Sequence, residues 1–443
     1  MKSRHTGRPH GVCTVGGKNG GVTDDTTRPD TTDTGAAATA STGPHRAPGA
    51  RLPLPAGFRA HTGRAGLRET GDDVSVVLTD SAEPACSAVF TRSLFAGPSV
   101  RISREHAASG RARGFVVVAK NANVATGERG LADARELLER VAAAQGVDPA
   151  ELLVASTGVI GRHYPMDLLR AHADGLRGAE FGADAVDVAS AMMTTDTHPK
   201  TAAAELPTTG GGTARVVGIA KGVGMIEPDM ATMIALVLTD AAVTPEQLDE
   251  AFRAAVDETF NRLSVDTDTS TSDTAVALAS GAAGPVEAAE LRRALGEVCL
   301  DLTRQLARDG EGATKLLTVR VTGARDHAQA TLVAKAILNS PLVKTAVHGA
   351  DPNWGRVAMA IGKCSDQTDI DPERVTIVFG DLEAYPAFPD EAGLARLAEI
   401  MRDEEVLIDV DLGVRSDAEA GECTVYGCDL SREYVTINAD YTT

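Results

Sequence analysis

The chain has 443 residues and a formal net charge of −19 at pH 7, which repels phosphate backbones and speaks against nucleic-acid binding. Only 3% of the residues are aromatic, so the core must be built from Ala, Val, Leu and Ile, which is enough at this length. No apolar run reaches membrane-spanning length, and the cysteines include no CxxC pair that would indicate a zinc or thioredoxin-like site. We therefore expect a cytoplasmic protein with no metal and with no membrane or nucleic-acid partner.

Residues 1–51 are predicted to form a disordered extension. From Thr31 onward this stretch consists mainly of Thr, Ala, Gly, Asp and Pro, so it cannot bury enough apolar surface to offset its ordering entropy. The early basic residues are not followed by an apolar stretch, which speaks against a secretory signal. We expect the folded sequence to begin near Leu52.

The first half of the folded sequence alternates short β-rich runs with amphipathic stretches. Residues 131–144 carry apolar residues at helical spacing with charges opposite, which predicts a helix. A strand over residues 152–155 enters the Ser156-Thr157-Gly158 turn, and Pro165 suits the first turn of the next helix. The other elements predicted here are strands at 74–78, 88–91, 115–119 and 214–220, and a helix at 184–193.

The second half begins with an apolar run at 233–238, which is typical of a buried strand. A long amphipathic helix is predicted over 245–263. The polar loop at 266–274 lacks the Gly and Glu spacing of an EF-hand, which favours a structural loop over a metal site. Further strands are predicted at 274–278, 316–321, 375–379, 406–410 and 423–426, and further helices at 288–307 and 329–338. Without regular βαβ alternation, this order predicts layered α/β structure with largely antiparallel sheets.

The segment at residues 220–233 differs from ordinary scaffold. It leaves a predicted strand, passes two glycines and a proline, and re-enters a buried strand at Thr232. Glycine and proline let the backbone turn sharply and approach another group closely. The small side chain of Ala231 leaves the carbonyl before Thr232 sterically open.

A threonine hydroxyl is a weak nucleophile, which an N-terminal α-amine with a reference pKa of about 7.7–8.0 can activate as a base. Self-cleavage before Thr232 would release such an amine. The hydroxyl would attack the Ala231 carbonyl, the acyl group would move from nitrogen to oxygen, and water would hydrolyse the ester. From spacing alone, a phosphate loop or a plain turn stays the commoner interpretation, although no Gly-Lys-Ser/Thr completes a Walker motif.

The segment resembles the self-processing motif of ornithine acetyltransferases, also called glutamate N-acetyltransferases. Further motifs of this family follow in the same order and cover nearly all of the chain after about residue 52. They lie at 121–123 (Asn-Ala-Asn), 156–161 (Ser-Thr-Gly-Val-Ile-Gly), 193–196 (Met-Thr-Thr-Asp), 309–315, 351–356 and 438–443. The chain resembles in particular the actinomycete paralogues found beside antibiotic genes.

The resemblance implies a layered α-β-β-α sandwich of the N-terminal-nucleophile-like type, with a smaller C-terminal α/β lobe. It implies self-cleavage between Ala231 and Thr232 into an N-terminal chain of residues 52–231 and a C-terminal chain of residues 232–443. Two such pairs are expected to form an α2β2 heterotetramer. The implied reaction moves an acetyl group from N2-acetyl-L-ornithine to L-glutamate by a ping-pong mechanism. An acetyl-threonine enzyme carries the group, so no cofactor is expected.

The resemblance also assigns site residues. Thr232 is implied to be the nucleophile; the alternative is that it is an ordinary buried threonine of a strand. Thr157 and Gly158 match the oxyanion-hole pair, in which a hydroxyl and a turn amide donate to the developing oxyanion, against the alternative of an ordinary turn. The positions that match substrate-binding residues are Thr194, Lys221, Thr232, Glu311, Asn438 and Thr443.

Some of these assignments carry alternatives. Lys221 suits an α-carboxylate and Glu311 suits an ammonium group, but both are also compatible with solvated charges. Thr194 is not clearly distinguished from its neighbour Thr195. The last residues lie at the chain end, where fraying is usual.

Other functions stay open as well. Some family members also accept acetyl-CoA, and no residue of this sequence decides that point. A related N-terminal-nucleophile amidase or aminopeptidase would use water as its acceptor. A non-catalytic paralogue would bind ornithine or acetylornithine without cleaving itself.

Overall fold

The computed structural model describes residues 51–227 and 233–440. The predicted N-terminal extension up to residue 50 lies outside the described residues. So do the bond between Ala231 and Thr232 and the terminal Thr443.

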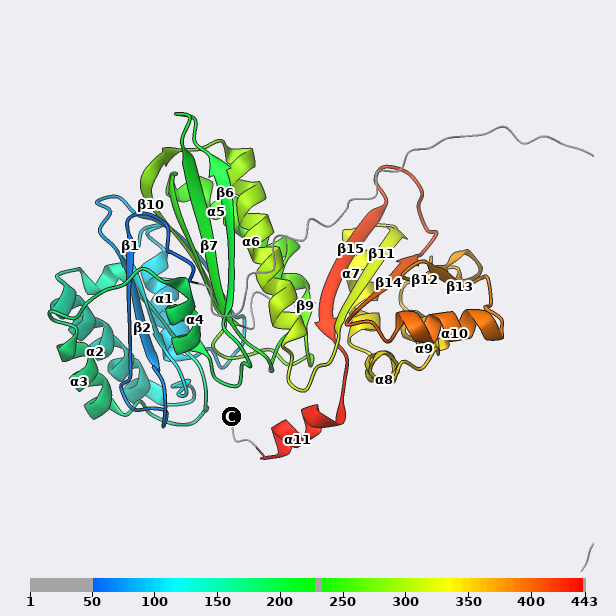
Figure 1. The fold of residues 1–443 in the computed structure, drawn as a ribbon, viewed down its shortest axis with the longest axis horizontal. Helices are drawn as coiled ribbons and strands as arrows, with labels where there is room; N and C mark the ends of the chain where they lie inside the picture. The colour runs from blue at the N-terminus through cyan, green and yellow to red at the C-terminus, as the bar shows by residue number, and fades with distance from the viewer. Residues whose placement is uncertain (1–50, 228–232, 441–443) are drawn as a thin grey trace, which may run out of the picture. The chain divides into compact units, whose positions relative to one another are not determined.

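Two β-sheets form the first part of the described fold (Figure 1). One has the strand order β1-β2-β4-β5 and the other has the order β3-β10-β8-β7-β6. Neighbouring strands are antiparallel, except for the parallel pairs β4–β5 and β8–β10. The strands are β1 (Phe58–Gly63), β2 (Val74–Thr79), β3 (Ala85–Phe90), β4 (Gly114–Val118), β5 (Leu152–Ser156), β6 (Lys200–Pro207), β7 (Thr213–Lys221), β8 (Ile234–Ala242) and β10 (Thr274–Pro285).

Successive side chains of these strands enter different cores, because a β-strand directs alternate residues to opposite faces. On β4, Phe115 belongs to the core between the two sheets and Val116 belongs to the core under one helical layer. On β8, Leu236 belongs to the core between the sheets and Val237 belongs to the core under the other helical layer. The outer helices are α2 (Gly127–Gln145) and α3 (Met166–Gly175) on one side, and α5 (Pro245–Glu258) and α6 (Ala288–Arg308) on the other. This α-β-β-α order confirms the predicted fold class.

A third sheet with its own hydrophobic core forms the C-terminal lobe. Its strand order is β13-β12-β14-β11-β15-β9. Its strands are β9 (Leu263–Ser264), β11 (Leu316–Ala324), β12 (Thr376–Phe379), β13 (Leu382–Tyr385), β14 (Glu405–Asp411) and β15 (Gly421–Cys428). The helices of the lobe are α7 (His327–Leu338), α8 (Pro341–Gly349), α9 (Gly355–Gly362) and α10 (Glu391–Ile400), and α11 (Arg432–Asp440) follows the last strand.

Two further helices, α1 (Pro98–Ala107) and α4 (Ala185–Met192), belong to the first part. Among the described residues no helix combines the length and the apolar character needed to cross a bilayer.

The prediction of a long helix over 245–263 is wrong at the C-terminal end. The helix stops at Glu258, and Thr259 leaves the helical conformation with φ −131° and ψ −79°. A short 3-10 turn at Phe260–Arg262 and strand β9 follow. Phe260 and Leu263 are fully buried and continue the helical spacing of Val256, so the apolar pattern runs on after the helix has ended.

An ion-pair cluster between α2 and α3 predicts a pH-dependent stability. Arg170 donates to both carboxylate oxygens of Glu136, at 2.8 and 2.9 Å, and Arg140 donates to the same carboxylate at 2.8 Å. These hydrogen bonds, with that of Arg170 first, lower the pKa of Glu136 to about 2. Because the folded pKa lies below the unfolded one, the stabilisation is present above about pH 4.5 and is lost as the pH falls through about 2.

We expect Glu136→Gln to lower the melting temperature at pH 7, by the small amount that exposed pairs worth about 0.2–1 kcal/mol allow. The difference from the unchanged protein should shrink as the pH falls toward 2, in thermal unfolding followed by circular dichroism. A difference that stays constant between pH 7 and pH 2 would contradict this assignment.

Candidate active site

The Thr157–Gly158 turn follows β5 and packs directly on the backbone after β4. The Thr157 amide donates to the Val118 carbonyl at 3.0 Å. Gly158 has a φ of +129°, and a Cβ atom there would lie 2.3 Å from the carbonyl carbon of Lys120. Only glycine fits this position. Among residues 51–227 and 233–440, no hydrogen-bond acceptor is found for the Gly158 amide, so this amide can serve an oxyanion.

Lys221, the last residue of β7, brings a buried ammonium group to this turn. Its Nζ donates to the Thr157 hydroxyl oxygen at 3.2 Å and lies 4.0 Å from Oδ2 of Asp196. Burial lowers the pKa of Lys221, and the Asp196 carboxylate opposes that effect. Because the Thr157 oxygen accepts from the lysine, its own hydroxyl proton stays available for donation to another group.

The two threonines that follow α4 make different contacts. The Thr195 hydroxyl donates to Oε1 of Glu311 at 3.3 Å. Thr194 is held through its backbone, because its carbonyl accepts from Lys120 at 2.6 Å and its amide donates to Asp196 at 3.0 Å. The Thr195 hydroxyl therefore contacts Glu311, and substrate binding by Thr194 stays a prediction.

Glu311 lies between Thr195 and the C-terminal helix. Asn438 on α11 donates to Oε2 of Glu311 at 2.8 Å, and the Glu311 amide donates to the Val223 carbonyl at 2.8 Å. A Cβ atom at Gly224 would lie 2.4 Å from the Glu311 carboxylate. This close approach explains the second glycine of the segment that the sequence singled out.

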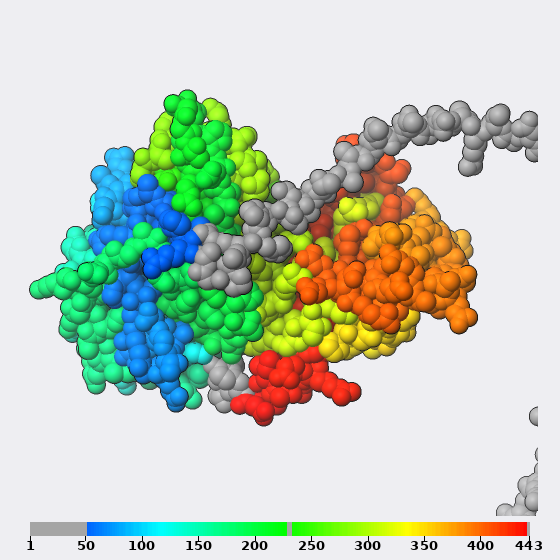
Figure 2. Space-filling model, in the orientation of Figure 1, coloured from blue at the N-terminus to red at the C-terminus, as the bar shows by residue number. Residues whose placement is uncertain are grey.

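Helix α11 is held to the rest of the fold by side-chain hydrogen bonds. The Ser431 hydroxyl donates to the Gly312 carbonyl at 2.6 Å, and the Tyr434 hydroxyl donates to Asp266 at 3.4 Å. In Figure 2 this helix, in red, lies against the yellow-green surface of the preceding segments. These contacts, together with that of Asn438, place the described end of the chain at the candidate site, whereas Thr443 lies outside the described residues.

The backbone that leads to residue 228 is held by the polar loop after β9. Asp266 accepts the amides of Met225 and Ile226 at 2.7 and 2.8 Å, and the Val265 amide donates to the Ile226 carbonyl at 2.6 Å. The Glu227 carboxylate accepts from Asn339 at 2.8 Å. These contacts give the loop a structural role. Within the described ranges no cluster of three or more His, Cys, Asp or Glu is suited to a metal.

The site brings together Thr157, Gly158, Lys221, Glu311 and Asn438. A sequence model described as the ArgJ family matches residues 59–443, which include all of them. The chain belongs to the ArgJ family. Glutamate N-acetyltransferase Oat2 of Streptomyces clavuligerus is 55% identical over 396 residues, which cover 88% of this chain and 98% of that protein. Arginine biosynthesis bifunctional protein ArgJ 2 of a Nostoc strain is 51% identical over 389 residues, with the same two coverages.

Two solved structures also match. An ArgJ protein from Bacillus halodurans is 42% identical, with a TM-score of 0.42, and covers 47% of this chain and 100% of its own. An ornithine acetyltransferase from Mycobacterium tuberculosis, solved with ornithine, is 32% identical, with a TM-score of 0.35, and covers 40% of this chain and 94% of its own. Family membership confirms the predicted enzyme class, a glutamate N-acetyltransferase and hence an acyltransferase of arginine biosynthesis.

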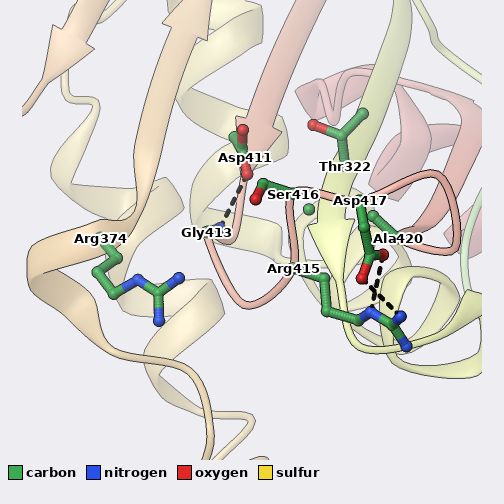
Figure 3. Close-up of a pocket in the computed structure, with 9 residues that line it drawn as sticks. Thr322, Arg374, Asp411, Gly413, Arg415, Ser416, Asp417 and Ala420 are labelled. Atoms are coloured by element: carbon green, nitrogen blue, oxygen red, sulfur yellow. Dashed lines mark hydrogen bonds and ion pairs between the residues drawn. The ribbon is translucent and has the colours of Figure 1, made fainter.

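A surface pocket of about 550 Å³ in the C-terminal lobe shares no residue with the candidate site. Figure 3 shows Arg374 and Arg415 beside it, with Arg415 paired to Asp417 at 2.8 Å. None of the residues that line the pocket was predicted to take part in the reaction.

At the candidate active site, four polar residues had no role predicted from the sequence. They are Thr195, Asp196, Lys120 and Asp266.

Proposed function

We propose that the chain transfers an acetyl group from N2-acetyl-L-ornithine to L-glutamate through an acetyl-Thr232 intermediate. Thr232 becomes N-terminal by self-cleavage after Ala231, which gives chains of residues 52–231 and 232–443. The observation that carries this proposal is the hydrogen bond between Lys221 and Thr157, since it joins a cation for a carboxylate to a candidate oxyanion donor. Ile234 pairs with Lys221 across β7 and β8, so the strand that follows Thr232 runs beside this lysine.

In the first half of the proposed reaction, the Thr232 hydroxyl attacks the acetyl carbonyl of acetylornithine and the free α-amine of Thr232 takes the hydroxyl proton. The Thr157 hydroxyl and the Gly158 amide donate to the resulting oxyanion. The C–N bond then breaks, the departing ornithine amine receives the proton, and an ester with Thr232 remains. In the second half, the amine of glutamate attacks this ester, which restores the hydroxyl and gives N-acetyl-L-glutamate.

Charge complementarity supports the assignment of the binding residues. The Lys221 ammonium suits the α-carboxylate that donor and acceptor share, and the Glu311 carboxylate suits the side-chain ammonium of ornithine. The Thr195 hydroxyl contacts Glu311 and is proposed to orient it, while Thr194 stays the proposed substrate-binding threonine. Asn438 holds the other oxygen of Glu311, and Thr443 is proposed to complete this end of the site.

The acetyl-enzyme should be detectable by mass. Incubation of the purified protein with acetylornithine alone is expected to add one acetyl group to the C-terminal fragment, and double-reciprocal plots for transfer should be parallel. Intersecting lines without a mass increase would point to direct transfer instead.

Two control reactions distinguish the alternative functions: one varies the acceptor and the other varies the acetyl donor. Acetate release that glutamate does not suppress would favour a hydrolase, whereas acetylation of the same fragment by acetyl-CoA would identify a bifunctional member. A native mass equal to two N-terminal and two C-terminal chains is expected from the proposed α2β2 assembly.

A further inference from the structure

Three buried charged residues join the segments of the candidate site. The side chains of Asp196 and Lys200 are fully buried, and that of Asp309 is 4% exposed. Lys200 Nζ lies 2.8 Å from Oδ1 of Asp196 and 2.5 Å from Oδ2 of Asp309. One ammonium group is therefore held between two carboxylates, in a place where isolated charges would be costly.

The carboxylates of this cluster also bind backbone amides from different parts of the chain. Asp196 accepts the Gly222 amide at 2.7 Å through Oδ1 and the Thr194 amide at 3.0 Å through Oδ2. Asp309 accepts the Thr197 amide at 3.1 Å. The cluster thus fixes the turn after α4, the end of β7 and the loop that begins at Asp309. These segments carry Thr195, Lys221 and Glu311 respectively.

Asp196 is also the principal counter-charge of Lys221. Burial lowers the pKa of Lys221, and among the charges that oppose this effect Asp196 acts more strongly than Asp273 and Glu311. The cations that face it, Lys200 and Lys120, disfavour its charged form. Burial by itself would raise the pKa of Asp196, but Lys221, Lys200 and the Thr194 amide hold it below the ordinary range of a carboxylic acid.

We propose that Asp196 is a positioning residue for the transfer reaction. It holds the Lys221 ammonium against Thr157 and aligns Lys221 with the segments that carry Thr195 and Glu311. This inference rests on the proposed function, because it takes Lys221 as the cation that binds the substrate carboxylate. Asp196 needs no contact with the substrate in this role. Its effect passes through Lys221 and through the two backbone amides that it accepts.

The test variant is Asp196→Asn, which keeps the shape and one acceptor oxygen but removes the charge. Without that charge Lys221 should lose its proton at lower pH, so the alkaline limb of the kcat/KM profile should move down by about one pH unit or more. At neutral pH we expect kcat/KM to fall by about tenfold to a hundredfold, as small misplacements in a site do. Adding Lys221→Arg should remove the shift of the limb, because a guanidinium group keeps its proton.

Asp429→Asn is the matched control. Asp429 is also buried and also accepts two backbone amides, those of Thr314 at 2.8 Å and Lys315 at 2.9 Å, but it makes no contact with Lys221 among the described residues. Its replacement should leave the alkaline limb in place, whatever it does to stability. An unmoved limb in Asp196→Asn, or an equal shift in both variants, would overturn the proposal.

The pH dependence of ornithine binding, measured by calorimetry, tests the same shift in the titration of Lys221 without requiring turnover. Absence of transfer in the unchanged protein would therefore count against the proposed function, while the shift in binding pH still tests Asp196. If Asp196→Asn does not fold, the double variant Asp196→Asn with Lys200→Met removes equal and opposite charges. It should show a smaller shift in the same direction, because Asp196 acts on Lys221 more strongly than Lys200 does. Failure of both variants to fold would assign Asp196 to the fold rather than to the site, and would also overturn the proposal.

Discussion

Thr232→Ala is expected to yield one uncleaved chain without transferase activity. The unchanged protein should give two fragments on a denaturing gel, and sequencing of the C-terminal fragment should begin Thr-Met-Ile-Ala. Alanine supplies no hydroxyl, so neither the acyl shift from the Ala231 carbonyl nor the later attack on acetylornithine can take place. The loss should be complete within the detection limit, which makes this the largest effect that we expect.

The described structure indicates that this variant should still fold. The backbone up to Glu227 is held by Asp266, and the chain continues in β8, whose side chains are buried on both faces. These contacts do not involve the Thr232 side chain. We therefore expect a near-normal melting temperature for the uncleaved chain.

Thr232→Ser is the matched control, because serine keeps a hydroxyl and is expected to retain some processing. Cleavage of the Thr232→Ala chain at the same bond would refute self-processing by this residue. A fragment that begins at any other residue would place the nucleophile elsewhere.

Much of the fold follows from sequence patterns, because long apolar runs and alternating residues report burial directly. The run that forms β8 and the strand that ends at Lys221 were both predicted, and the structure pairs them in one sheet. The pairing itself, like the contact between Glu311 and Asn438, joins residues that are distant in the sequence. No local pattern contains that information.

Short elements with small side chains were missed for a different reason. Strand β6 contains three consecutive alanines and one leucine, so its alternation has little contrast. Helix α8 did carry a local signal, since Ser340 accepts the Val343 amide as the N-cap and Pro341 begins the helix. Capping residues could have identified that helix, whereas β6 needed its partner β7.

Which of Thr194 and Thr195 contacts Glu311 could not be predicted from the sequence. Both residues belong to an irregular turn without a side-chain period, so neither neighbour is marked as inward-facing. The direction is set by Asp196 and Lys120, which hold the Thr194 backbone and leave the Thr195 hydroxyl toward Glu311. The roles of Asp196 and Asp266 were likewise hidden, because each binds backbone amides from distant segments.

The second large effect is expected at Thr157. If its hydroxyl donates to the oxyanion, Thr157→Ala should slow acetyl transfer by roughly a hundredfold to a thousandfold, or about 2.7–4 kcal/mol, the usual cost of one such donor. The structure adds a second consequence, because the variant removes the oxygen that accepts from Lys221 at 3.2 Å. Lys221 then keeps Asp196 as its counter-charge, so we expect the main loss in kcat and a smaller change in KM.

Thr157→Ser separates these chemical effects from structural damage. Serine restores the hydroxyl that faces Lys221 and should recover most of the rate, while both variants keep the Thr157 amide that binds the Val118 carbonyl. If Thr157 were only a turn residue, alanine would cost about 1 kcal/mol of stability and little activity. Self-cleavage passes through an oxyanion at a different carbonyl, so turnover must be counted per cleaved chain in samples with a near-normal melting temperature. A near-normal rate for Thr157→Ala under those conditions would remove the hydroxyl from the mechanism and leave the Gly158 amide as the proposed donor.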